Sequence, residues 1–145
     1  MVTKENVIHR IREFNRFYMP KLGLLDNHYL GSEYTPTEAR VLFEIYENDG
    51  CNAAYIARTM NIDKSYLSRI IKAYEKNGFI ARNVSETDSR AYHIHLTEKG
   101  MVRTKELIEK SNQEIDSIIQ CLNKDEYAEL MEAFHTITAI LEKCS

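Results

Sequence analysis

Six segments of the chain carry apolar residues at helical spacing, and one segment carries them at the spacing of a strand. The apolar stripe within residues 1–20 predicts a first helix. A second helix is expected after Thr35, because a capping threonine, a proline and then Glu38 are a typical helix start, and it extends to about Glu47. Residues 21–34 contain glycines and polar residues, which indicates a loop with room for a short helical turn.

Two short helices joined by a tight turn are predicted next. Asn52 is placed to cap a third helix and Asp63 to cap a fourth, residues 64–76. The apolar residues of the fourth helix define an inward face: Leu67, Ile70, Ile71 and Tyr74. The outward face is small, polar and basic: Ser65, Tyr66, Ser68, Arg69 and Lys72. Two such helices crossing at a steep angle form a helix-turn-helix, whose second helix can lie in the major groove of DNA.

A β-hairpin is predicted directly after Gly78, where the fourth helix ends. A first strand begins at residues 79–80, and the alternating residues of a second strand are Tyr92, Ile94 and Leu96. The polar turn between the strands carries Asp88 and Arg90. When a helix lies in the major groove of DNA, an arginine at a hairpin tip can enter the neighbouring minor groove. We therefore expect Arg90 to contact DNA and Asp88 to orient a neighbouring arginine, since phosphates repel a carboxylate.

The last third of the chain predicts two further helices. Thr97 caps one, and Asn123 followed by Glu126 is a capping pattern that opens the other. A small winged domain cannot cover their apolar stripes and that of the first helix, so dimerisation is the economical explanation. The predicted fold class is mainly α with a small β-hairpin wing: a dimerisation helix in residues 1–20, a winged helix-turn-helix in residues 35–96 and C-terminal dimerisation helices in residues 97–145.

The net charge of −3 hides an uneven distribution along the 145 residues. Residues 1–63 carry seven Lys and Arg against nine Asp and Glu (−2), residues 64–105 nine against four (+5), and residues 106–145 three against nine (−6). A basic centre between acidic flanks is typical of a localised phosphate-binding face. The apolar runs are too short to span a membrane and the N-terminus resembles no targeting signal, so we expect a cytoplasmic protein.

Cysteine and histidine residues offer two weaker hypotheses. The three cysteines, Cys51, Cys121 and Cys144, indicate neither a disulfide framework nor a zinc site. Cys51 lies at the start of the third helix, where a helix N-terminus can lower the pKa of a thiol and make it an oxidant sensor. His93 and His95 lie two positions apart on one face of the strand. This spacing fits either a pair of metal ligands or an ordinary exposed polar face. A metal sensor needs three or four convergent ligands, so no metal or cofactor is expected.

The chain resembles the MarR family of winged helix-turn-helix transcriptional regulators over nearly its whole length. The most specific matches are residues 67–71 (Leu-Ser-Arg-Ile-Ile), residues 78–80 (Gly-Phe-Ile), the Asp-x-Arg wing signature at Asp88 and Arg90, and residues 96–100 (Leu-Thr-Glu-Lys-Gly). Residues 12–18, 22–26 and 37–42 are similar to the MarR half of proteins that fuse such a regulator to a GNAT acetyltransferase. No acetyltransferase activity is expected from these 145 residues.

The resemblance implies a homodimer on a pseudo-palindromic operator in double-stranded DNA, with half-sites about one helical turn, roughly 34 Å, apart. It also implies repression of nearby genes, which is relieved when a small molecule, metal or oxidant engages the joint between the dimer and DNA-binding parts. A pocket for an anionic or phenolic effector would lie between the first helix, the following loop and the second helix, lined by Arg16, His28, Tyr29, Tyr34 and Arg40. The same residues equally suit interhelical ion pairs and loop packing.

We therefore expect a sequence-specific DNA-binding transcriptional regulator, a homodimeric repressor released by a small-molecule effector. The alternative is a winged-helix protein-interaction module, or the regulatory partner of a separate acetyltransferase. An enzyme is not expected, because the chain has no Gly-rich phosphate loop, nucleophile elbow or paired catalytic carboxylates. The basic central segment separates the two hypotheses, since it predicts a steep salt dependence for DNA binding and little for an apolar protein interface.

Overall fold

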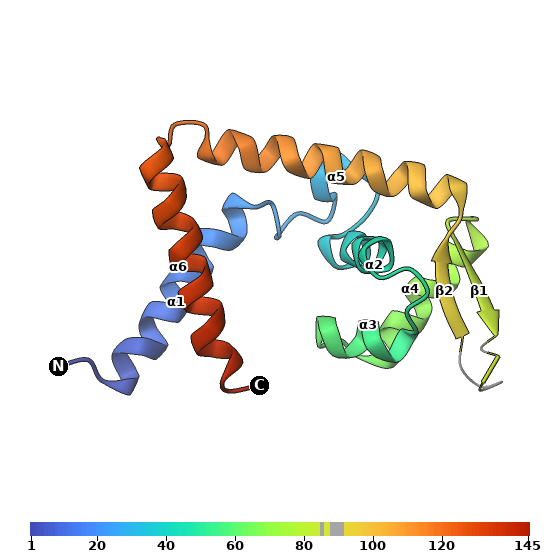
Figure 1. Cartoon of the computed structure of the whole chain (residues 1–145), viewed down its shortest axis with the longest axis horizontal. Coiled ribbons are helices and arrows are strands. Elements are labelled where there is room, and N and C mark those ends of the chain that lie inside the picture. The colour runs from blue at the N-terminus through green and yellow to red at the C-terminus, as the bar shows by residue number, and fades with distance from the viewer. Residues whose placement is uncertain (85, 88–91) are drawn as a thin grey trace. The chain divides into compact units, whose positions relative to one another are not determined.

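The computed structural model describes residues 1–84, 86–87 and 92–145. Within them the elements follow in this order (Figure 1): α1 (Lys4–Lys21), η1 (Tyr29–Gly31), α2 (Pro36–Glu47), α3 (Ala53–Met60), α4 (Lys64–Lys76), β1 (Ile80–Val84), β2 (Tyr92–Leu96), α5 (Glu98–Ile119) and α6 (Lys124–Glu142). The chain divides into two compact units, Met1–Gln113 and Glu114–Ser145. The predicted fold class, mainly α with a small hairpin, is confirmed.

Capping residues start the helices where the sequence indicates. At α2 the Thr35 hydroxyl accepts from the Glu38 backbone N–H at 3.2 Å, and the Glu38 carboxylate accepts from the Thr35 N–H at 2.9 Å. Asn123 and Glu126 form the same reciprocal pair at α6. A third such box, at Thr3 of α1, was not predicted. Each box satisfies N–H groups that have no partner within the helix, so these helix starts are fixed locally.

The turn between α3 and α4 depends on Asn61. Its backbone, at φ 51° and ψ 50°, is left-handed, a conformation that asparagine tolerates better than most residues. The N–H groups of Asn61 and Ile62 bond to carbonyls in the last two turns of α3. The Asp63 carboxylate then accepts from the N–H groups of Ser65 and Tyr66. The chain therefore reverses within three residues, and α4 begins directly after its predicted cap.

The hairpin is buried only at its base. β1 and β2 pair antiparallel, with Ile80 opposite Leu96. Ile80 and Ile94 are 3% and 1% exposed, whereas Tyr92 is 45% exposed. The predicted inward alternation is therefore correct for Ile94, while Tyr92 lies outside the core because the hairpin has already left the helices at that point.

The second edge of β2 bonds to the segment between α2 and α3. The Ile94 N–H donates to the Cys51 carbonyl at 2.8 Å, and the Gly50 N–H donates to the Ile94 carbonyl at 2.9 Å. Gly50 has φ 84°, a conformation that glycine adopts without strain. These bonds anchor the base of the hairpin to the backbone just before the helix-turn-helix.

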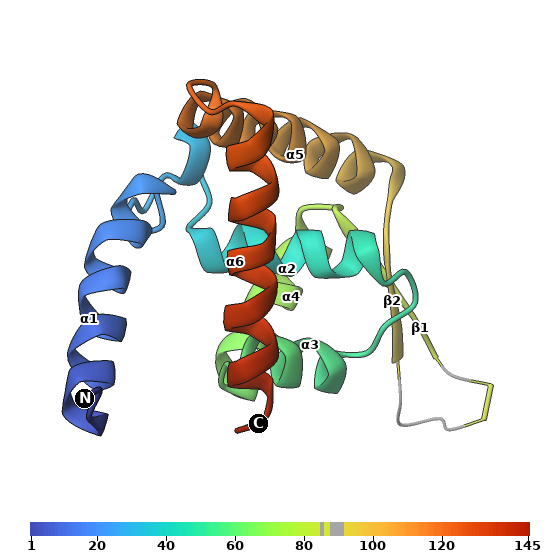
Figure 2. The same cartoon turned by 60° about the vertical axis from the view of Figure 1, so that its left-hand side comes forward.

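One hydrophobic core organises the first unit. In both views α2 lies between the first half of α5 and α3 (Figures 1 and 2). The core residues are Tyr34, Ala39, Val41, Leu42, Ile45, Ile56, Ala57, Leu67, Ile70, Ile71, Tyr74, Ile80, Ile94 and Leu107. All four residues predicted as the inward face of α4 belong to it. Leu107 of α5 is also fully buried. The helical pattern alone could not show whether this residue packs inside the chain or faces a second copy.

The first turn of α5 is fixed to the end of α4. The Thr97 hydroxyl accepts from the Gly100 N–H at 3.0 Å, as the predicted cap, and donates to the Gly78 carbonyl at 2.5 Å. A Cβ on Gly100 would lie 1.9 Å from the Phe79 carbonyl oxygen, so the helix approaches this turn more closely than any side chain would allow. Residues 96–100 thus have a structural role in placing α5.

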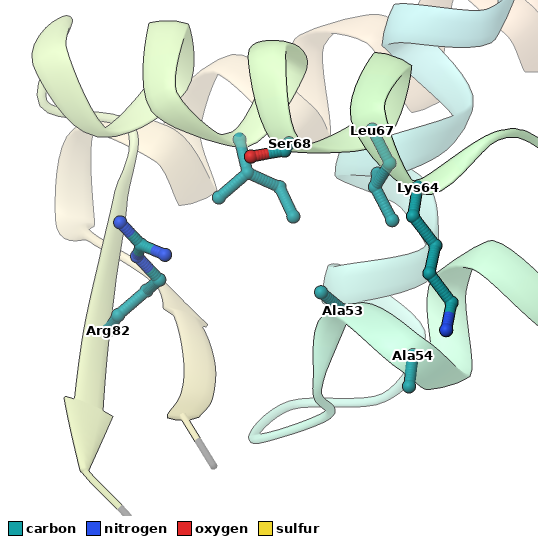
Figure 3. Close-up of a pocket in the computed structure, with 7 residues that line it drawn as sticks. Ala53, Ala54, Lys64, Leu67, Ser68 and Arg82 are labelled. Atoms are coloured by element: carbon teal, nitrogen blue, oxygen red, sulfur yellow. The ribbon is translucent and has the colours of Figure 1, made fainter. Parts of the chain in front are cut away.

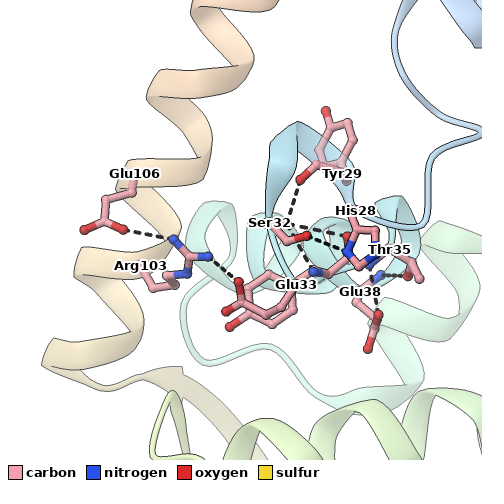
Figure 4. Close-up of polar contacts among 9 residues, drawn as sticks. His28, Tyr29, Ser32, Glu33, Thr35, Glu38, Arg103 and Glu106 are labelled. Carbon is pink, nitrogen blue, oxygen red and sulfur yellow. Dashed lines mark hydrogen bonds and ion pairs between the residues drawn. The ribbon is translucent and has the colours of Figure 1, made fainter.

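Tyr34 connects the loop before α2 to α4 and α5. Its ring is 6% exposed and lies edge-on to Tyr74, with 5.7 Å between ring centroids. The Arg103 guanidinium of α5 lies 5.5 Å from the Tyr34 ring centroid. Arg103 also forms ion pairs with Glu33 at 2.6 Å and with Glu106 at 3.0 Å (Figure 4). Tyr34 is therefore a core residue clamped by α5.

α1 and α6 expose apolar side chains along their length. The exposed residues include Val7, Ile8, Ile11, Phe14 and Phe17 on α1, and Tyr127, Leu130, Met131, Phe134, Ile137, Ile140 and Leu141 on α6. Monomeric proteins rarely expose so many apolar residues along the faces of their helices. Among the described residues, no helix combines the length and apolar character needed to cross a bilayer.

Candidate nucleic-acid interface

The outward side of α4 carries the five residues predicted to meet DNA. Ser65, Ser68, Arg69 and Lys72 are exposed, and Tyr66 is half-buried. Because the opposite side of α4 is buried in the core, this helix cannot rotate to present other residues. The structure therefore fixes which face is available, and the contacts of the five residues with DNA stay a prediction.

Arg69 lies along α4. Its guanidinium carbon is 5.8 Å from the centroid of the Tyr66 ring, within the range of a cation–π contact. This contact places the Arg69 guanidinium along the surface of α4. A guanidinium held by its face keeps its N–H groups at the edge, where they can donate to a base or a phosphate.

A small cavity of about 170 Å³ adjoins the outward side of α4, between the start of α3 and β1 (Figure 3). Its lining residues are Ala53, Ala54, Lys64, Leu67, Ser68, Ile71 and Arg82. Lys64 and Arg82 lie on opposite sides of it in Figure 3. Positive charge therefore lies on both sides of the cavity, beside the exposed face of α4.

Arg82 has a protein partner that the sequence did not predict. It forms an ion pair with Glu75 of α4, and the Arg82 guanidinium holds the pKa of the Glu75 carboxyl below its usual range. The two residues are seven positions apart and lie on different kinds of element. Because one lies on a helix and the other on a strand, neither helical nor strand periodicity could have indicated the pair.

Two predicted wing residues, Asp88 and Arg90, lie outside the described residues. The strands on either side of them are described, and the register pairs Val84 with Tyr92. The hairpin itself is therefore confirmed. The minor-groove contact of Arg90 and the orienting role of Asp88 stay predictions from the sequence.

Cys51 does not have the environment of an oxidant-sensing thiolate. It precedes Asn52, the cap of α3, and packs against the core. Burial raises the pKa of the Cys51 thiol, whereas an oxidant sensor needs a lowered pKa. The helix N-terminus was expected to lower this pKa, but burial outweighs it, because removing the thiol from water disfavours its charged form.

His93 and His95 connect β2 to the segment before α3. His93 Nδ1 lies 2.9 Å from the Gly50 carbonyl oxygen, and His95 Nδ1 lies 2.9 Å from the Asp49 carboxylate. Over residues 1–84, 86–87 and 92–145, no group of three or more His, Cys, Asp or Glu is arranged to hold a metal ion. The two histidines therefore have structural partners on this edge of the hairpin.

A larger, open cavity of about 460 Å³ lies between the end of α1, α2 and the α3–α4 turn. Its lining residues are Met19, Leu24, Tyr29, Pro36, Thr37, Arg40, Phe43, Thr59, Met60 and Ile62. Of the five predicted effector residues, the structure brings Tyr29 and Arg40 together here. The other three do not line it: Tyr34 lies in the core, His28 contacts the Ser32 carbonyl and Arg16 is exposed on α1.

The methionines and threonines of this cavity were missed by sequence reasoning. Met19 lies in the last turn of α1 and Met60 ends α3, so their proximity arises from tertiary packing rather than from any spacing in the chain. Thr37 and Thr59 line the cavity together with Arg40. Arg40 itself donates from Nε to the Glu44 carboxylate at 2.7 Å.

Comparisons with known proteins agree with this architecture. Residues 34–92 match the model of the MarR family. The putative transcriptional regulatory protein for the hcr operon of Thauera aromatica is 28% identical over 86 residues, which cover 57% of this chain and 52% of the relative. The regulator PetP of Rhodobacter capsulatus is 29% identical over 86 residues, covering 59% and 49%. The matched region is thus about half the length of these curated relatives.

A solved structure shares the whole fold. Streptococcus pneumoniae FabT, determined in complex with DNA, has a TM-score of 0.78 at 20% identity and covers 95% of this chain and 99% of its own. At this identity the likeness establishes the fold, which includes all six helices and the hairpin. The segment that matches the family model spans the helix-turn-helix and most of the hairpin. Over residues 34–92, the chain is therefore similar to the MarR family.

Proposed function

We propose that this protein is a sequence-specific DNA-binding transcriptional regulator that acts in the cytoplasm, and not an enzyme. The observation that carries the proposal is the exposed polar and basic side of α4, held between a tight helix-turn-helix turn and an anchored hairpin. A helix with this composition fits the major groove, where side chains reach the edges of the bases. The FabT structure supports the proposal, because a protein of this fold was solved bound to DNA.

The residues of α4 divide between two tasks in this proposal. Arg69 donates to base edges, since a guanidinium can bond two acceptors of a guanine at once. Lys72 and Lys64 meet phosphates, which hold the protein in place without distinguishing sequences. Arg90, predicted at the tip of the wing, enters the neighbouring minor groove.

A homodimer presents two copies of this interface. The exposed apolar residues of α1 and α6 supply the surface that a second copy would bury, and both helices lie outside the segment that would meet DNA. Two α4 helices related by a twofold axis require a pseudo-palindromic operator. Their half-sites would lie about one turn of DNA, roughly 34 Å, apart.

The open cavity beside α2 is the proposed effector site. It joins apolar walls from Met19 and Phe43 to a cation, Arg40, which suits a small aromatic ligand with a negative charge. Its lining includes Ile62 of the turn that precedes α4, so a ligand bound there contacts the segment that places the DNA-binding helix. Repression that such a ligand relieves is the regulatory mode proposed here.

The effector proposal is tested with 4-hydroxybenzoate as a probe of this chemistry. We expect it to weaken DNA binding by the unmodified protein, and Arg40→Ala to remove this response. Arg58→Ala is a matched control, because Arg58 is an exposed residue of α3 that does not line the cavity. An equal response from the protein and both variants would place the ligand elsewhere.

DNA binding itself is tested by fluorescence anisotropy. The purified protein is titrated against the DNA upstream of its own gene and against a scrambled duplex of equal composition, at several salt concentrations. We expect tighter binding to the upstream DNA and a steep fall in affinity with salt, because each neutralised phosphate releases counterions. Equal, weak binding to both duplexes would contradict sequence-specific regulation and favour the protein-interaction hypothesis.

A further inference from the structure

Arg82 of β1 and Glu75 of α4 form a two-point ion pair across the junction of helix and hairpin. Arg82 Nε donates to Glu75 Oε2 at 2.9 Å, and Nη2 donates to Oε1 at 2.9 Å. Two parallel bonds of this kind fix the plane of a guanidinium as well as its distance. In Figure 3 the Arg82 guanidinium points from β1 toward α4. The pair therefore connects the two elements in one defined geometry.

The same guanidinium also contacts the second strand. Its central carbon lies 5.3 Å from the centroid of the Tyr92 ring on β2. This distance is typical of a cation–π contact. Tyr92 is half exposed, so burial in the core does not account for its position. Arg82, a residue of β1, thus contacts both α4 and β2.

Core packing holds only the base of the hairpin. Ile80 is buried, and the four residues of β1 that follow it are exposed. Bonds from β2 to residues 49–51 hold one edge of the hairpin, so its direction also depends on contacts made by the other strand, β1. Arg82 lies two residues beyond Ile80, at the point where the strands leave the core. Its contacts are well placed to set the direction of the hairpin relative to α4.

We infer that Glu75 and Arg82 are positioning residues for DNA recognition, whose ion pair holds the β1–β2 hairpin at the angle to α4 that lets both elements contact one duplex. The inference rests on the proposed function. Fixing this angle before binding reduces the conformational freedom that is lost on the operator, which strengthens specific binding. Binding to arbitrary DNA depends mainly on charge and needs no such fixed angle.

Simple electrostatics predicts the opposite effect for Glu75. This residue is one of four acids among residues 64–105, which carry a net charge of +5. A carboxylate near DNA repels phosphates, so its neutralisation alone would strengthen binding to every duplex by a similar factor. A positioning role requires instead that neutralisation weaken the preference for the operator. The two explanations therefore differ in the ratio of two affinities.

Two substitutions disrupt the ion pair, and they differ in their effect on charge. Glu75→Gln keeps the size of the side chain and removes one negative charge. Arg82→Lys keeps the positive charge but loses the planar fork that makes two parallel bonds. Glu98→Gln is the control, because it removes the same charge from an exposed residue at the start of α5. Thermal unfolding of each full-length variant is measured alongside.

The experiment compares affinities for the upstream duplex and the scrambled duplex at one salt concentration. We expect both Glu75→Gln and Arg82→Lys to lower the ratio of the two affinities by about fivefold or more, through loss of preorganisation, with little change in melting temperature. Glu98→Gln should leave the ratio unchanged. A ratio that stays at the unmodified value in both variants would overturn the inference while leaving the proposed function intact. A ratio of one in the unmodified protein would overturn both.

Discussion

At the scale of single residues, the fold depends on a few positions where the geometry strongly restricts the choice of side chain. Asn61 makes the left-handed turn between α3 and α4. Tyr74 donates its hydroxyl to the Glu38 carbonyl at 2.6 Å, which fixes the end of α4 to the start of α2. Burial raises the pKa of the Tyr74 phenol, so it stays a neutral donor at ordinary pH. Such contacts fix the orientation of α4, and with it the side of the helix that stays exposed.

Gly100 is the position where a single methyl group should be most damaging. The added Cβ of Gly100→Ala would lie 1.9 Å from the Phe79 carbonyl oxygen and 2.8 Å from its carbon, and the backbone there cannot easily move. We expect a loss of about 3 kcal/mol or more in the free energy of unfolding, at the upper end of overpacking effects. Urea unfolding measures it. Lys105→Ala, an exposed position on the same helix, should change it by less than about 0.5 kcal/mol.

Cys51 should react slowly with alkylating agents. Its raised pKa leaves a smaller thiolate fraction at pH 8 than an ordinary thiol has, and only the thiolate reacts. We expect iodoacetamide to label Cys51 at least about tenfold more slowly in the folded protein than in the urea-unfolded chain, by mass spectrometry. The rate should increase as the pH is raised above 8. Fast labelling in the folded protein at pH 7 would instead indicate an activated thiol.

At the scale of elements, the sequence predicts what is determined locally. The caps at Thr35, Asn52, Asp63 and Asn123 and the bounds of α4 are confirmed, because each depends on residues within four positions of one another. Contacts between distant segments were not predicted, and the Arg82–Glu75 and Arg103–Glu33 ion pairs are examples. The effector residues show the same limit. Only two of five line the cavity, because the side chains that meet there depend on how α1, the following loop and α2 pack together.

The outward side of α4 should carry sequence preference, and Arg69 should carry most of it. Arg69→Ala is expected to reduce affinity for the upstream duplex by about 1–3 kcal/mol, while affinity for the scrambled duplex falls much less. Competition titrations with both duplexes measure the difference. Lys124→Ala removes one positive charge at the start of α6 and should affect neither duplex strongly. An equal loss on both duplexes for Arg69→Ala would reduce its role to phosphate binding.

At the scale of the whole molecule, charge and apolar surface are separated along the chain. The basic residues concentrate in residues 64–105, which include α4 and the hairpin, whereas residues 106–145 carry three basic against nine acidic residues. The acidic C-terminal part includes α6, none of whose residues is buried within this chain. A second copy that covers the apolar residues of α1 and α6 would leave the two basic segments free for DNA.

Dimerisation should therefore be sensitive to charge placed on α6. Ile137 is 47% exposed, and Ile137→Glu would put a carboxylate into the proposed interface without disturbing the core of the first unit. We expect the dimer dissociation constant to rise at least about tenfold, since an unpaired charge buried at an interface costs several kcal/mol. Sedimentation equilibrium measures it, with Glu129→Gln as a control on the same helix. A protein that is monomeric before any substitution would contradict the dimer.

The central claim is that α4 reads the major groove of a specific site. The most direct measurement is protection of guanine N7 from dimethyl sulfate along the upstream DNA, because N7 lies in the major groove. We expect two protected patches about 10 base pairs apart, both lost with Arg69→Ala. Bound DNA whose guanines react as freely as those of unbound DNA would contradict it, because the protein would then be held by phosphates alone.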